Sequence, residues 1–171
     1  MKPARSGSKI RVMLVEDHVL VRTGLISAIN LEPDIEVVAE AEEAEQAVKS
    51  FRRYWVDVVV LDLGMRSIDG VQIMRKLRGE LGPVRILALS RHGGIHDIAC
   101  AVQEGACGCI ARGMELDHLL EGIRTVHAGG EYFPHEIARR IAESTRSEES
   151  RRELPLRPIA NETATVKSPV L

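Results

Sequence analysis

Two short apolar runs that end in acidic residues constrain the fold of this chain more than any other feature. Residues 12–15 are followed by Glu16 and Asp17, and residues 58–61 are followed by Asp62. A short continuous apolar run is typical of a strand that helices cover on both faces of a parallel sheet. In such sheets, ligands bind beyond the carboxyl ends of the strands.

The three acids therefore predict a charged crevice at one end of the sheet. Neighbouring carboxylates repel one another, and bringing them together is costly unless a cation lies among them. A single acid at a strand end would more simply be a cap. Three acids at two matched positions favour the cation site over capping.

Strand-like and helix-like segments alternate along the chain. We predict strands at residues 10–15, 35–39, 57–61, 84–89 and 107–111. The intervening segments place apolar residues on one helical face. These faces comprise Val21, Leu25, Ala28 and Ile29; Ala44, Ala47, Val48, Phe51 and Trp55; Ile73, Met74 and Leu77; Ile98, Ala101, Val102 and Gly105; and Leu116, Leu119, Leu120 and Ile123. The pattern predicts an α/β fold, a five-stranded parallel doubly wound (βα)5 sandwich with right-handed crossovers.

Composition excludes several classes of protein. The 171 residues suit one domain with a short extension, and the 44% hydrophobic content is enough for a sizeable core. The net charge of −2 does not indicate a general affinity for nucleic acid or anionic membranes. No apolar stretch approaches the roughly 18 residues of a membrane-spanning helix, and no signal peptide is recognisable. We therefore expect a cytoplasmic protein that does not bind membranes.

The cysteines and the C-terminal residues carry weaker signals. Cys100, Cys107 and Cys109 form no Cys-x-x-Cys pair, which favours reduced structural cysteines over metal ligands and leaves redox sensing as a minor alternative. We expect a short linker helix in residues 131–144, opened by a proline. Residues 145–171 are rich in charge, serine and proline, which predicts a disordered tail.

Taken together, these motifs resemble the receiver domain of bacterial two-component response regulators over residues 9–130. The best-matching stretches are residues 12–18 (VMLVEDH) and 59–65 (VVLDLGM), continued to Asp69-Gly70. Gly105-Ala106 and residues 119–124 also resemble the branch that ends in a LuxR-type helix-turn-helix. The resemblance implies the flavodoxin-like receiver fold.

The resemblance also implies a reaction at Asp62. Its carboxylate would accept a phosphoryl group from a phosphohistidine on a sensor histidine kinase. A carboxylate suffices as the nucleophile because the phosphoryl transition state is loose and catalysis consists mostly of positioning and charge neutralisation. The chain would then be a phosphoacceptor in a phosphorelay, catalysing only its own phosphotransfer and dephosphorylation, and not an enzyme acting on other substrates.

The same resemblance implies a ligand set for Mg²⁺. Asp17, Asp62 and the backbone carbonyl of Gly64 would bind the ion, with Glu16 acting through a water. Mg²⁺ prefers oxygen ligands and retained waters, which suits a shallow carboxylate crevice. Ser90, at the end of a buried apolar run, would bond a phosphoryl oxygen.

Three residues depart from the family pattern. Arg112 stands where the family usually has a lysine that reaches the phosphoryl group, and its planar fork differs from a compact ammonium. Cys109 replaces the aromatic switch residue, and Arg66 replaces the usual proline after Met65. These departures favour an alternative interpretation, a receiver that works independently of phosphorylation.

The leading hypothesis is a receiver that signals through protein contacts. By resemblance, the face formed by residues 94–127, helix 4, strand 5 and helix 5, would bind a partner or a second copy of the chain. DNA binding by this chain alone is not expected, because residues 145–171 lack the apolar period of a packed helix-turn-helix. A truncated LuxR-type DNA-binding regulator remains an alternative.

Overall fold

A single parallel sheet forms the centre of the molecule. The computed structural model describes residues 9–65, 70–90, 94–139 and 142. Its strands are β1 (Ile10–Val15), β2 (Ile35–Ala41), β3 (Val58–Asp62), β4 (Ile86–Ser90) and β5 (Gly108–Ala111). They pair in the order β2-β1-β3-β4-β5, all parallel. This topology confirms the predicted five-stranded doubly wound fold.

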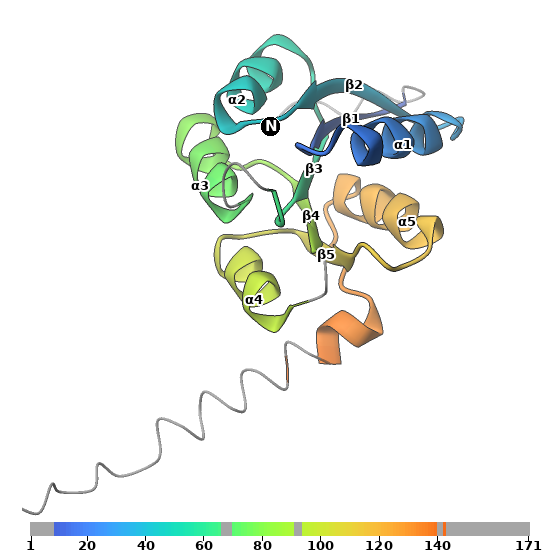
Figure 1. Ribbon diagram of the computed structural model, residues 1–171, viewed down its shortest axis with the longest axis vertical. Coiled ribbons are helices and arrows are strands. Elements are labelled where there is room, and N and C mark those ends of the chain that lie inside the picture. Colours follow the sequence, from blue (N-terminus) through green and yellow to red (C-terminus); the bar gives the residue numbers. More distant parts are fainter. Residues whose placement is uncertain (1–8, 66–69, 91–93, 140–141, 143–171) are drawn as a thin grey trace, which may run out of the picture.

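In the described part of the chain, helices α1 to α5 cover both faces of the sheet, as Figure 1 shows. On one face lie α1 (Val19–Asn30) and α5 (Leu116–His127), and on the other lie α2 (Ala44–Arg53), α3 (Gly70–Leu81) and α4 (Ile95–Gln103). Each face has its own apolar cluster. Every residue of β3 and β4 is buried, because both faces of these central strands are covered.

Several residues lie outside the helical faces predicted for them. Helix α2 ends at Arg53, so Trp55 lies in the following connection and is 64% exposed. Leu116, the first residue of α5, is 42% exposed. Gly105 lies beyond α4 with φ +83°, a left-handed conformation that glycine adopts without strain and that ends the helix.

The cysteines are free thiols on opposite faces of the sheet. Strand β5 begins at Gly108, so Cys107 precedes the strand and packs against the α1/α5 cluster, whereas Cys109 belongs to the opposite cluster. Their spacing of two residues would place both side chains on one face of a regular strand, and this expectation is wrong because Cys107 lies before the strand begins. Burial raises the pKa of the Cys109 thiol to about 12, so this thiol stays protonated and unreactive at neutral pH.

Residues 131–139, which we call the strap, cross the outer edge of β5. The backbone N–H of Tyr132 donates to the Cys107 carbonyl at 3.0 Å, and the N–H of Cys109 donates to the Tyr132 carbonyl at 3.1 Å. Tyr132 packs against the α1/α5 cluster, whereas Ile137 is buried on the α4 face. The strap therefore satisfies backbone groups that an edge strand otherwise exposes. Its residues 135–139 are helical.

The described helices are too short and too polar to cross a bilayer; none is a candidate span. Several sequence expectations lie outside the described residues. They concern Arg66, Asp69, residues 140–141 and 143–144 of the linker helix and the tail at residues 145–171.

Candidate functional site

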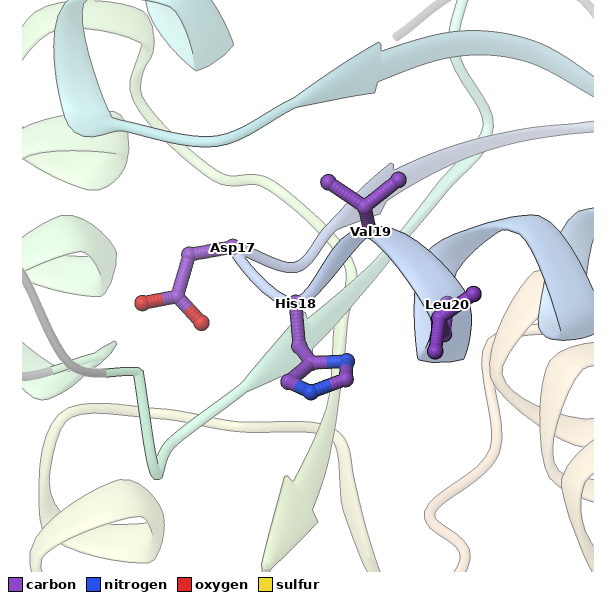
Figure 2. Close-up of a pocket in the computed structure, with 4 residues that line it drawn as sticks. All are labelled: Asp17, His18, Val19 and Leu20. Atoms are coloured by element: carbon purple, nitrogen blue, oxygen red, sulfur yellow. The ribbon is translucent and has the colours of Figure 1, made fainter.

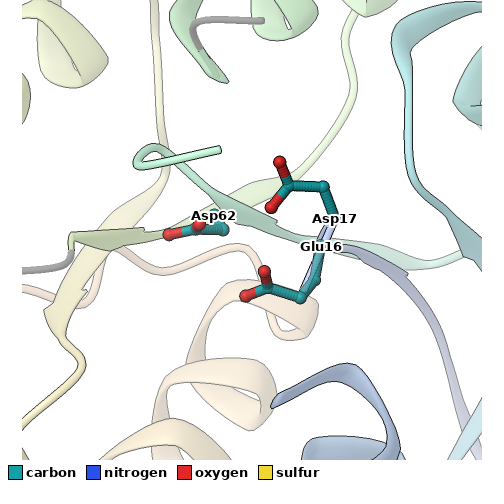
Figure 3. A group of neighbouring side chains, drawn as sticks. All are labelled: Glu16, Asp17 and Asp62. Atoms are coloured by element: carbon teal, nitrogen blue, oxygen red, sulfur yellow. The ribbon is translucent and has the colours of Figure 1, made fainter. Parts of the chain in front are cut away.

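The three predicted acids meet at the carboxyl ends of β1 and β3. Asp62 is the last residue of β3, while Glu16 and Asp17 directly follow β1, its neighbour in the sheet. Each acid offers a carboxylate oxygen to a group whose oxygens all lie within 4.8 Å of one another, and Figure 3 shows the three side chains gathered there. Glu16 and Asp62 are fully buried. The crevice predicted from the two apolar runs is therefore present.

Arg112 reaches into this crevice from the turn after β5. Its Nη2 lies 2.7 Å from Oδ2 of Asp62 and also pairs with Oε2 of Glu16. The Arg112 side chain is 20% exposed, whereas both carboxylates are fully enclosed. A buried carboxylate is costly without a partner, so this guanidinium is a principal source of neutralisation for the crevice.

A second arginine, Arg22 of α1, binds the backbone and side chains around the end of β1. Its Nη1 donates to the Glu16 carbonyl at 2.8 Å, and its Nε and Nη2 pair with Glu40 and Glu42 at 2.9 and 2.6 Å. The Glu16 carboxylate in turn accepts the backbone N–H of His18 at 2.9 Å, just before α1 begins. These bonds fix the backbone that carries Glu16 and Asp17.

The loop after Asp62 and the end of β4 complete the site. The N–H of Gly64 donates to Oδ1 of Asp62 at 3.1 Å. The backbone N–H of Arg112 donates to the Ser90 carbonyl at 2.9 Å, which places Ser90 beside the turn that carries Arg112. Among the described residues, no hydrogen-bond partner faces Oγ of Ser90 or Nε of Arg112, although both atoms are buried. Buried polar groups are normally satisfied, so these two donors are candidates to bond an anionic oxygen of a ligand.

A hollow of about 270 Å³ adjoins the acids. Asp17, His18, Val19 and Leu20 line it, as Figure 2 shows. Val19 and Leu20 are 58% and 78% exposed. An apolar surface therefore lies directly beside the charged crevice.

The oxygen atoms in the crevice fit a hard divalent cation. Three carboxylates at two strand ends supply the oxygen ligands that Mg²⁺ prefers, and Asp17 is only partly buried, which allows retained waters. The role of the Gly64 carbonyl as a ligand stays a prediction.

The model of the response regulator receiver domain family matches residues 12–124. This chain belongs to that family. Glu16, Asp17, Asp62, Ser90 and Arg112 of this receiver all lie within the matched range.

Individual relatives point to the same family. The receiver is 36% identical over 133 residues to the response regulator UvrY of Escherichia coli strain K12, covering 78% of this chain and 61% of UvrY. It is 31% identical over 139 residues to the transcriptional regulatory protein DegU of Brevibacillus brevis, covering 81% of this chain and 59% of DegU. The chain therefore spans less than two thirds of the length of either relative.

A solved structure matches the fold over nearly its whole length. The crystal structure of a LuxR-family two-component response regulator from Aurantimonas sp. SI85-9A1 aligns with a TM-score of 0.75 and 34% identity. The alignment covers 81% of this chain and 99% of that chain. The relatives and this structure bear out the resemblance to the LuxR-type branch.

Two functional features were not anticipated from the sequence. Nothing in the sequence singles out Arg22, and only the packing of α1 against β2 shows that Glu40 and Glu42 face it. Arg112 was expected to reach a phosphoryl group, but its contacts with Glu16 and Asp62 depend on how the turn after β5 reaches across β4 to the ends of β3 and β1. The one sequence signal for these contacts is that an arginine directly follows the fifth apolar run.

Proposed function

We propose that this receiver accepts a phosphoryl group on Asp62 from a phosphohistidine of a sensor histidine kinase. The observation that carries the proposal is the acidic cluster at the ends of β1 and β3, with Asp62 as its one member on β3. An oxygen of the Asp62 carboxylate attacks phosphorus, the P–N bond to the imidazole breaks, and the imidazole nitrogen takes up a proton. The product is an acyl phosphate on Asp62.

The surrounding residues neutralise and orient the transferred group. The Oγ of Ser90 and the Nε of Arg112 are buried donors without a partner among the described residues, and they would bond phosphoryl oxygens. Mg²⁺ would be held directly by Asp17, Asp62 and the Gly64 carbonyl, and by Glu16 through a water. When bound, Mg²⁺ supplies the positive charge that lets the carboxylates and the phosphoryl oxygens approach one another.

Two surfaces suit protein partners. The exposed Val19 and Leu20 beside Asp17 provide apolar contact area for a kinase that must bring its phosphohistidine to the crevice. The face at residues 94–127 is the candidate surface for an output partner or a second copy. The strap crosses the edge of β5 within this face, so a partner there would contact the strap as well.

The domain boundaries follow from the same proposal. Residues 9–130 form the receiver and residues 131–144 a linker that includes the strap. A DNA-binding output remains a second possibility, which DegU, named a transcriptional regulatory protein, favours.

Labelling with a small-molecule phosphodonor tests the proposal. The wild type is expected to form an acyl phosphate in the presence of Mg²⁺, and Asp62→Asn is expected to form none, because an amide is not a nucleophile here. Asp57→Asn is the matched control: Asp57 lies just before the opposite end of β3, where it accepts the Arg11 N–H at 3.0 Å. Equal labelling of wild type and Asp62→Asn would remove Asp62 as the acceptor.

A receiver that works without phosphorylation is the competing function. The ion pairs of Arg112 favour it, because they already satisfy the acids that would otherwise attract a cation. It predicts that Asp62→Asn binds the same partner with unchanged affinity. The phosphoacceptor proposal predicts that phosphorylation changes the affinity of the wild type and not that of Asp62→Asn.

A further inference from the structure

We propose that Arg112 acts as a built-in counter-ion, which has to leave Glu16 and Asp62 before a divalent cation can bind them. The inference rests on the proposed function, since it concerns the same cation site. It assigns to Arg112 a role in setting metal affinity, as distinct from its expected contact with the phosphoryl group.

The position of one nitrogen carries the argument. Nη2 of Arg112 contacts both Oε2 of Glu16 and Oδ2 of Asp62, so a single positive group lies between two of the three acids. All three acids offer oxygens within 4.8 Å of one another. A magnesium ion binds its oxygens at roughly 2.0–2.1 Å. The guanidinium nitrogen and the ion therefore need the same space and the same lone pairs.

Burial makes this contact strong enough to matter. Both carboxylates have no exposed side-chain surface, so water screens the ion pairs weakly. The Arg112 contact with Glu16 is a charge-assisted hydrogen bond, which is stronger than a neutral one, and its contact with Asp62 is an ion pair. A cation that enters the crevice has to replace them, which weakens its apparent affinity.

The location of Arg112 allows the displacement. The residue lies in a turn after β5, and its side chain is 20% exposed, so it already reaches solvent. The guanidinium can thus leave the acids while the Arg112 N–H keeps its bond to the Ser90 carbonyl and the sheet stays intact. Released from Glu16 and Asp62, its nitrogens become available to phosphoryl oxygens.

Arg112 could weaken Mg²⁺ binding by occupying the crevice or merely by repelling the ion through its charge. The two explanations predict different Mg²⁺ affinities for Arg112→Lys. Arg112→Lys keeps the charge but replaces a planar fork with a flexible, strongly hydrated ammonium. Arg112→Gln removes the charge. Competition predicts that Mg²⁺ binds wild type most weakly, Arg112→Lys more tightly and Arg112→Gln most tightly. Repulsion alone predicts equal affinities for wild type and Arg112→Lys.

Isothermal titration of the full chain with Mg²⁺ tests the inference. We expect Arg112→Lys to bind about tenfold more tightly than wild type, because the ion no longer replaces arginine bonds to two buried carboxylates. Arg52→Lys is the control, since Arg52 forms an exposed pair with Glu80 and its variant should bind like wild type. Equal or weaker binding by Arg112→Lys overturns the inference and leaves the proposed function standing.

A measurement on the wild type keeps the inference testable if a variant folds poorly. The Nε–H of Arg112 is buried, so its NMR resonance should be observable and can be assigned by its loss in Arg112→Lys or Arg112→Gln. Added Mg²⁺ is expected to shift this resonance over the same range of Mg²⁺ concentrations in which calorimetry detects binding. Binding without a shift contradicts displacement. Absence of Mg²⁺ binding by every variant overturns both the inference and the metal site of the proposed function.

Discussion

Gly70→Ala is expected to lower the free energy of unfolding by at least about 2 kcal/mol and to impair labelling of Asp62. A Cβ on Gly70 would lie 2.5 Å from the Asp62 carbonyl oxygen and 2.6 Å from Cα of Leu63. Both are backbone atoms, so no side-chain rotation relieves the clash. Helix α3 has to move away from the end of β3, and that movement shifts the loop that positions the Asp62 carboxylate. Chemical denaturation and phosphodonor labelling measure the two effects.

Gly79→Ala is the matched control in the same helix. Gly79 is exposed, and a Cβ there would meet nothing within 4 Å. Alanine in a helix interior is more favourable than glycine by roughly 0.5–1 kcal/mol, so this variant should be slightly more stable than wild type and labelled normally. If the free energy of unfolding of Gly70→Ala equalled that of the wild type, the close approach of α3 to β3 would be contradicted.

Ile137→Ala is expected to lower the free energy of unfolding by about 2–4 kcal/mol. Ile137 is 1% exposed and belongs to the cluster on the α4 face of the sheet. Its truncation removes buried apolar contacts and leaves a cavity that the surrounding residues fill only in part. Hydrogen exchange should report the largest loss of protection at the Cys109 and Tyr132 amides, which form the bonds between the strap and β5.

His135→Ala is the control, since His135 is an exposed residue of the same helical turn. It should leave both the unfolding free energy and the exchange of the two amides unchanged. If Ile137→Ala behaves like His135→Ala, the strap does not contribute to the folded domain, and the face at residues 94–127 is open to partners without it.

The spacing of apolar residues along the sequence was enough to predict the sheet and most of the helical faces. Residues 12–15 and 58–61 are apolar without interruption because both faces of their strands are covered, and the same burial fixes where the strands end. The acids that follow these runs could therefore be placed in one crevice from the sequence alone. Helix ends were less predictable: Trp55 continues the period of α2, but the backbone is already extended at Tyr54.

Contacts between distant segments could not be predicted in the same way. Nothing in the local pattern distinguishes Arg22 from other arginines on helices, because its burial depends on Glu40 and Glu42 across the α1–β2 packing. The strap depends on pairing between Tyr132 and the edge of β5. For Arg112, the resemblance indicated a phosphate contact, but the ion pairs with Glu16 and Asp62 became visible only when the ends of three strands were brought together.

The most direct test of the central claim is to map the phosphorylated residue in the wild-type chain. The receiver is labelled with a phosphodonor and Mg²⁺, the acyl phosphate is trapped by borohydride reduction, and the peptides are sequenced by mass spectrometry. We expect modification at Asp62 alone, and none when Mg²⁺ is replaced by a chelator. Modification at another residue, or an unmodified Asp62 after full exposure to the donor and Mg²⁺, would contradict the claim.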